Sequence, residues 1–138
     1  MTNFQWPVRV YYEDTDAGGV VYYANYLRFF ERARTEWMRA SGFEQDQLRQ
    51  QHQLVFAVRS IEVDYLFPAR FNQLLLVDTH ITQFRGASIL FSQQISSTEP
   101  DTIQVLCRAH VRIVCINAQS FTPCPIPDFL KSELQKNV

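Results

Sequence analysis

The sequence has no excess of charge and no long apolar run. Thirteen Lys and Arg residues balance fourteen Asp and Glu residues, so the formal net charge is −1, and the basic residues are scattered among acidic ones. A nucleic-acid-binding surface needs a basic patch, so we expect neither RNA nor DNA as a partner. No apolar run approaches the length of a membrane-spanning helix, and the start, MTNFQWP, lacks the basic and apolar regions of a secretion signal. We therefore expect no membrane span and a cytoplasmic location.

Cysteine and histidine are few, and their spacing argues against a metal site or a disulfide framework. The three cysteines are odd in number and show no C-x-x-C spacing. Cys107 and Cys115 share strand parity, which predicts small side chains buried in the core. Cys124 stands between two prolines in an expected surface segment, and the three histidines are far apart in sequence. We expect no metal ion.

The length of the chain and its apolar content of 46% suit a single domain, residues 1–138, with a sizeable core. No internal repeat or low-complexity segment divides it. After residue 121, three closely spaced prolines predict an extended tail. This tail is expected to end in a short helix over 128–135, capped by Asp128.

One long amphipathic helix is predicted from about Tyr22 to Gly42. Apolar residues recur every three or four positions, while the opposite face carries charged pairs. Gly42 suits the left-handed position that closes a helix. The high aromatic content favours a helix packed in a concave sheet. The apolar face is expected to contain Tyr22, Tyr26, Phe29 or Phe30, Ala33 and Trp37.

Alternation of apolar and polar residues predicts strands around this helix. In the last one, alternate positions from Ile103 to Cys115 are apolar, so one face is covered and the other is wet or forms an interface. Strands joined by tight turns, such as the turn at Gly86, must be antiparallel. The order of elements therefore predicts an α+β fold with an antiparallel sheet. The predicted strands are 8–12, 54–66, 74–84, 87–95 and 103–115, with a short helix at 45–51.

The most distinctive segment, RVYYEDTDAGGVVYYANY at residues 9–26, joins a strand to the long helix through an acidic turn. The first N–H groups of a helix lack intrahelical acceptors, so they can hold a carbonyl oxygen that becomes negative during a reaction. The carboxylate of Asp16 can act there as nucleophile or general base. Gly18 and Gly19 allow a tight turn and close approach of a ligand. On the pattern alone, an ordinary loop in which residues 14–16 compete as cap or turn residues is the more frequent explanation.

The same segment resembles the signature of the 4-hydroxybenzoyl-CoA thioesterase family of hot-dog-fold proteins. The matching residues are Arg9-Val10, Thr15-Asp16, Gly19-Val20 and Tyr26. The stretch YYEDTDAGGVVY and the helical ERAR are most similar to the YbgC branch, acyl-CoA thioesterases associated with the Tol-Pal system. The later stretches YLFPAR and RGAS extend the similarity to most of the chain. The resemblance implies a hot-dog fold, in which an antiparallel sheet wraps around one long central helix. It also implies hydrolysis of an acyl-CoA to the free acid and CoA, without a cofactor.

The resemblance implies roles for three residues of the turn. Asp16 is the catalytic nucleophile or general base, and the backbone N–H of Tyr23 is the oxyanion donor. Tyr12 contacts the acyl group or orders the loop, although an aromatic residue in the core at a strand end explains it equally well. Most members of the YbgC branch have histidine at the position of Tyr23. A phenol, with an unperturbed pKa of about 10, is a poor base at neutral pH, so we expect this exchange to affect rate and substrate choice more than reaction type.

Coenzyme A carries phosphates, so arginine side chains and open backbone are expected near the mouth of the site. Each arginine is individually more typical of a solvated surface. The candidate substrate-binding residues are Gly19, Val20, Arg59, Arg70, Arg85, Gly86 and Ser88. Glu31 is predicted to form an i,i+3 ion pair with Arg34, but some other hot-dog thioesterases use a helical glutamate catalytically, so Glu31 is the control residue.

The expected partner is an acyl-CoA substrate, with acyl carrier protein as an alternative carrier. We expect a homodimer or homotetramer, because hot-dog protomers commonly join their sheets edge to edge and the final strand has few charges to guard an exposed edge. A hot-dog dehydratase is less consistent with the sequence, because the turn contains no histidine. The alternative from another class is a protein that binds acyl-CoA or acyl carrier protein, or a cell-envelope partner, with little catalysis.

Overall fold

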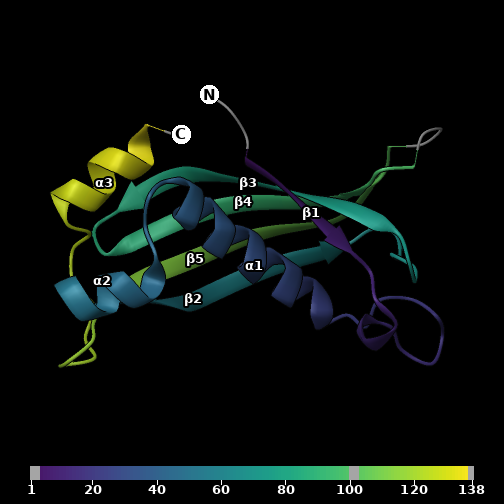
Figure 1. Cartoon of the computed structure of the whole chain (residues 1–138), viewed down its shortest axis with the longest axis horizontal. Helices are drawn as coiled ribbons and strands as arrows, with labels where there is room; N and C mark the ends of the chain where they lie inside the picture. The colour runs from purple at the N-terminus through teal and green to yellow at the C-terminus, as the bar shows by residue number, and fades with distance from the viewer. Residues whose placement is uncertain (1–3, 100–102, 137–138) are drawn as a thin grey trace.

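The computed structural model of the chain describes residues 4–99 and 103–136, in which one long helix lies across a five-stranded antiparallel sheet (Figure 1). The predicted α+β class is confirmed. The strand order is β1-β3-β4-β5-β2, and every pairing is antiparallel. The elements are β1 (Phe4–Arg9), a 3₁₀ turn (Tyr12–Asp14), α1 (Asn25–Ala40), α2 (Gln45–His52), β2 (Leu54–Tyr65), β3 (Leu74–Arg85), β4 (Ser88–Ser97), β5 (Val105–Asn117) and α3 (Asp128–Gln135).

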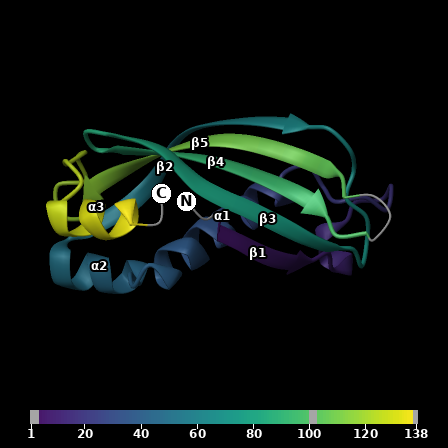
Figure 2. The same cartoon turned by 90° about the horizontal axis from the view of Figure 1, so that it is seen from above.

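The core fills the space between α1 and one face of the sheet. Trp37, Phe29 and Phe30 of α1 are almost completely buried. Alternate residues of the strands meet them, as the period of two requires. Figure 2 shows the twisted sheet with α1 on one side. Buried members of the strand faces are Leu75, Val77, Ile81, Ile89, Phe91, Ile95, Cys107, Ala109 and Val111.

The two ends of the molecule carry different elements. The loop between β1 and α1 lies at one end, together with the end of β2, whereas α2 and α3 lie at the other end with the β3–β4 turn (Figure 1). Gly86 makes that turn with a φ of +58°, and its carbonyl accepts a hydrogen bond from Ile126 at 3.3 Å. The end of the molecule at which a residue lies therefore determines which site that residue can reach within one protomer.

Several predicted boundaries are wrong. The first strand covers Phe4–Arg9 and includes Pro7, which β1 tolerates as an edge strand. Helix α1 begins at Asn25, and Tyr22 lies before it with 45% of its surface exposed. Ile103 is 83% exposed and precedes β5. The helix at Asp128–Gln135 has the predicted bounds, but Pro127 is its N-cap residue and no side chain caps it.

The final strand is not an edge of the sheet, which corrects one argument for oligomerisation. Strand β5 lies between β4 and β2, so its backbone groups are paired on both sides. The edges are β1 and β2. Strand β2 carries a bulge at Arg59, where the register with β5 shifts between Val58 and Ser60. An edge-to-edge contact would therefore have to use β1 or β2.

Candidate active site

The loop before α1 folds into a tight turn around Asp16. The N–H of Asp16 donates to the carbonyl of Val20 at 2.9 Å, and the N–H of Gly19 donates to the carbonyl of Asp16 at 3.0 Å. Gly19 has a φ of +79°, a left-handed conformation that glycine adopts without a steric penalty. A bridge between Val20 and Arg70 fastens the turn to the segment that follows β2.

The Asp16 side chain is exposed, and one of its two carboxylate oxygens accepts a hydrogen bond. Its Oδ1 accepts a hydrogen bond from the N–H of Gly18 at 2.8 Å. Within residues 4–99 and 103–136, no donor contacts its Oδ2. One oxygen thus fixes the orientation of the carboxylate, while the other is available to a substrate or a water molecule.

The residues that lead into α1 leave two N–H groups open. The N–H of Tyr22 donates to the carbonyl of Asp14 at 3.0 Å, and that of Asn25 donates to the carbonyl of Tyr22 at 2.8 Å. In the part of the chain that the structure describes, the N–H groups of Tyr23 and Ala24 have no acceptor. Two unpaired donors at a helix N-terminus are suited to stabilise a developing oxyanion.

A cleft of about 390 Å³ brings the carboxylate and this helix start together. Among the predicted site residues, Asp16, Val20 and Tyr23 line it. Most of the other lining residues have no role predicted from the sequence, although the YLFPAR stretch, which resembles the family, contains four of them. The lining residues are Asp16, Val20, Val21, Tyr22, Tyr23, Tyr26, Tyr65, Leu66, Phe67 and Pro68.

Tyrosines form much of the wall of this cleft. The ring of Tyr65 meets those of Tyr26 and Tyr23 edge to face, with centroid distances of 5.4 and 6.4 Å. The hydroxyl of Tyr26 accepts a hydrogen bond from the N–H of Ala69 at 3.0 Å. Burial raises the pKa of Tyr26 and of Tyr65, and a hydrogen bond with Tyr23 raises that of Tyr22. These hydroxyls are therefore neutral donors at physiological pH.

Tyr12 lies outside the set of residues that line the cleft. It begins the 3₁₀ turn with 82% of its surface exposed, and its ring packs edge to face against Phe71 at 6.1 Å. The alternative interpretation, a core aromatic at the end of a strand, is wrong. Its proposed contact with the acyl group stays a prediction.

The candidate CoA-binding residues are spread over both ends of the protomer. Arg70 lies beside the Asp16 turn through its bridge to Val20. Arg59 is the exposed bulge residue of β2. Arg85 and Ser88 flank the β3–β4 turn at the opposite end (Figure 1), so they do not reach the Asp16 cleft of the same chain.

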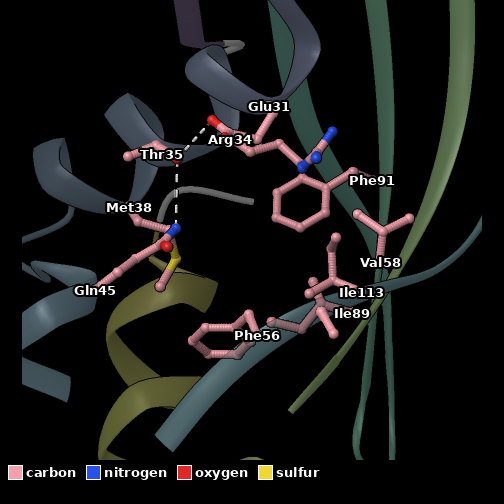
Figure 3. Close-up of a pocket in the computed structure, with 11 residues that line it drawn as sticks. Glu31, Arg34, Thr35, Met38, Gln45, Phe56, Val58, Ile89, Phe91 and Ile113 are labelled. Atoms are coloured by element: carbon pink, nitrogen blue, oxygen red, sulfur yellow. Dashed lines mark hydrogen bonds between the residues drawn. The ribbon is translucent and has the colours of Figure 1, made fainter. Parts of the chain in front are cut away.

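A second cavity, of about 150 Å³, opens between α1 and the β2 side of the sheet (Figure 3). Its walls are mostly apolar, and Glu31, Arg34 and Thr35 contribute polar groups from α1. The predicted ion pair between Glu31 and Arg34 is wrong. Glu31 accepts a hydrogen bond from Thr35 at 3.2 Å, whereas the Arg34 guanidinium donates to Gln93 at 2.9 Å. Burial lowers the pKa of Arg34 to about 10, and the charge of Glu31 partly opposes this shift.

The described residues contain no cluster of three or more His, Cys, Asp or Glu side chains arranged to hold a metal ion. Across residues 4–99 and 103–136, no helix combines the length and the apolar character that crossing a bilayer requires.

Cys107 and Cys115 are buried free thiols, as predicted, and Cys124 is half-buried with its Sγ 3.7 Å from that of Cys115.

The sequence and the fold both match known thioesterases. Residues 10–134 match the model of the thioesterase-like superfamily. The acyl-CoA thioesterase YbgC of Haemophilus influenzae is 44% identical over 129 residues, which cover 94% of this chain and 92% of that protein. A probable thioesterase from Bartonella henselae has 36% identity and a TM-score of 0.84, covering 91% of this chain and 100% of that one. The 4-hydroxybenzoyl-CoA thioesterase bound to 4-hydroxybenzoyl-CoA shares 20% identity, with a TM-score of 0.90 over 96% of this chain and 98% of that one, and supports the hot-dog fold alone.

Proposed function

This chain belongs to the thioesterase-like superfamily and, within it, to the YbgC acyl-CoA thioesterases, and we propose that the carboxylate of Asp16 performs its chemistry. The protein is an acyl-CoA thioester hydrolase, and the predicted hot-dog fold is confirmed. The observation that carries the assignment to Asp16 is its place in one cleft with Tyr23 at the start of α1.

The chemistry requires a polarised carbonyl and an oxygen nucleophile. The thioester oxygen would accept hydrogen bonds from the open N–H groups of Tyr23 and Ala24, which stabilise the negative charge that develops on it. The free Oδ2 of Asp16 would then either attack the carbonyl carbon or take a proton from a water that attacks it. In both routes the C–S bond breaks and CoA leaves as a thiolate. The first route passes through an acyl–aspartate anhydride, which water hydrolyses.

The exchange of histidine for Tyr23 is compatible with this mechanism. The proposed contribution of residue 23 is its backbone N–H, which any residue except proline supplies. The phenol ring instead forms part of the cleft wall with Tyr22 and Tyr65. We expect the ring to influence which acyl groups enter, and to leave the type of reaction unchanged.

Free-thiol release from a panel of short, long and aromatic acyl-CoAs tests the proposal. Asp16→Asn should lower turnover by a factor of roughly 10³ or more, because the amide is neither a nucleophile nor a base. Glu31→Gln, a matched change in the second cavity, should retain most of the activity. Turnover that survives Asp16→Asn would exclude Asp16, and loss of turnover in Glu31→Gln alone would assign the reaction to the helical carboxylate.

Acyl carrier protein is the alternative carrier for the same thioester. The same assay with acyl-loaded carrier protein distinguishes it, since a carrier-specific enzyme would ignore acyl-CoA. If a folded protein hydrolysed neither thioester, a role in binding an acyl carrier or a cell-envelope partner would be favoured. A cytoplasmic location and a link to the Tol-Pal system are part of this proposal and are supported by the resemblance to the YbgC branch.

We propose that the protein forms at least a homodimer through β2. This edge strand exposes Val58, and its neighbours Phe56 and Ala57 line the second cavity. If two β2 strands paired antiparallel, the end of one protomer that contains Arg85 would lie near the end of its partner that contains the Asp16 cleft. Arg85 could then contact a phosphate of the CoA bound in the partner's cleft. Light scattering after size exclusion should give a multiple of 16.2 kDa. A monomer at micromolar concentration would exclude this arrangement.

A further inference from the structure

Tyr65, the last residue of β2, makes a contact that the proposed mechanism does not yet use. Its hydroxyl donates a hydrogen bond to the backbone carbonyl of Tyr23 at 3.0 Å. The two residues are 42 positions apart in the chain. The contact therefore ties the end of the sheet to the start of α1.

The carbonyl of Tyr23 belongs to the same planar peptide group as the N–H of Ala24. Because this group is rigid, a hydrogen bond that holds the carbonyl also fixes the direction of the N–H on its opposite side. The preceding peptide is held in the same way, since the carbonyl of Tyr22 accepts from Asn25 at 2.8 Å. Each of the two open N–H groups therefore belongs to a peptide whose carbonyl is fixed. A bound carbonyl also polarises its own peptide, which strengthens the N–H as a donor.

Packing holds the Tyr65 ring where this hydrogen bond requires it. The ring contacts Tyr26 and Tyr23 edge to face, an arrangement that aromatic quadrupoles favour. Tyr26 is buried at 4% exposure and anchored to Ala69, so it provides a firm support. Tyr65 itself is 47% exposed and lines the cleft.

We propose that Tyr65 is a positioning residue that holds the Tyr23–Ala24 peptide so that the N–H of Ala24 points at the thioester oxygen, beside the N–H of Tyr23. This inference rests on the function proposed above. It adds a residue that acts through the backbone of the helix start. Its contribution should appear in the chemical step and leave substrate binding largely unchanged.

Tyr65→Phe tests this role, because it removes the hydroxyl and keeps the ring. We expect kcat to fall about tenfold, less than the roughly 10²- to 10³-fold lost when an oxyanion donor is removed outright. KM should change by less than about twofold, because the lost interaction acts in the transition state. Tyr11→Phe, which removes a hydroxyl from an exposed tyrosine in the loop between β1 and α1, should leave both constants unchanged. An unchanged kcat, or a change in KM alone, would overturn the proposal.

An infrared measurement separates this role from a structural one. Asp16→Asn is loaded with an acyl-CoA that carries ¹³C at the thioester carbonyl, and the carbonyl stretch of the bound substrate is recorded. Adding Tyr65→Phe should move this stretch to higher frequency, because weaker donors polarise the carbonyl less. An identical stretch in both proteins would overturn the inference even if kcat fell. Failure of the proposed function is recognised separately, as turnover that persists in Asp16→Asn alone.

Discussion

The guanidinium of Arg34 donates to the side-chain oxygen of Gln93 at 2.9 Å inside the core. The amide nitrogen of Gln93 in turn donates to the carbonyl of Phe30 at 3.0 Å and to the hydroxyl of Thr79 at 2.9 Å. Gln93, a residue of β4, therefore links helix α1 to strands β3 and β4. Both partners are buried, at 8% and 2% exposure.

Replacing Gln93 should destabilise the fold strongly. Gln93→Leu removes three hydrogen bonds and leaves the buried charge of Arg34 without its acceptor, so the free energy of unfolding should fall by roughly 3 kcal/mol. Arg34→Met combined with Gln93→Leu removes the charge as well and should recover part of that loss. Urea unfolding of the two variants measures the difference. Equal stability of Gln93→Leu and the wild type would show that these three hydrogen bonds contribute nothing to the free energy of unfolding.

Tyr26→Phe should leave a buried donor unpaired. The N–H of Ala69, a residue with no exposed surface, donates to the Tyr26 hydroxyl at 3.0 Å. Removing that hydroxyl should lower the free energy of unfolding by about 1–3 kcal/mol. Tyr22→Phe, at a half-exposed site in the same cleft, should cost less than about 0.5 kcal/mol. Equal effects of the two changes in thermal or urea unfolding would contradict this account.

Alkaline solution should destabilise the protein through its buried thiols. Burial raises the pKa of Cys107 and of Cys115 from 9.0 to about 12. Between these values the unfolded chain loses the proton and the folded chain keeps it. The stability that each neutral thiol contributes is therefore complete below pH 9 and is lost progressively as the pH rises toward 12.

At pH 10 this loss should be about 1.4 kcal/mol for each thiol, since the pH is one unit above the ordinary pKa. Cys107→Ala removes one of the two thiols, so its stability relative to the wild type should improve by that amount between pH 8 and pH 10. Unfolding in urea at the two pH values measures the change. A constant difference between the two proteins would contradict the assigned pKa.

The periodic parts of the fold were predictable from the sequence, because burial of one face imposes a period. Helix α3 and strands β2 to β4 fall within two residues of their expected bounds. Edge strand β1 was displaced, because Pro7 interrupts the pattern without ending the strand. The exposure of Tyr22 follows from a turn that continues to Ala24, which periodicity does not detect.

The sequence predicted the part of the candidate site whose residues lie close together in the chain. Asp16 and Tyr23 belong to one recognisable segment, and the structure brings them into one cleft. Gln93 and Tyr65 contact α1 and its start from 59 and 42 residues away, and no local pattern marks such a partner. Arg34 was therefore assigned to its nearest carboxylate, Glu31, although its side chain turns into the core.

Gly18 and Gly19 are adjacent, but they should respond differently to alanine. A Cβ at Gly18 would lie 3.2 Å from Oδ1 of Asp16, the same atom that accepts the N–H of Gly18. A Cβ at Gly19 would meet nothing within 4 Å, but its φ of +79° strains any residue with a side chain. One glycine is thus required by the position of the carboxylate and the other by the backbone.

Gly18→Ala should therefore reduce kcat/KM by about ten- to a hundredfold, because a small displacement of a reacting group strongly lowers the rate. The free energy of unfolding should change by less than about 0.5 kcal/mol. Gly19→Ala should cost about 1–2 kcal/mol of stability, with a smaller effect on turnover, because the strain is stored in the backbone. Thiol-release kinetics and urea unfolding of both variants measure the two quantities separately. If Gly18→Ala kept full activity, the orientation of Asp16 that its hydrogen bond to Gly18 defines would not be the one that the reaction uses.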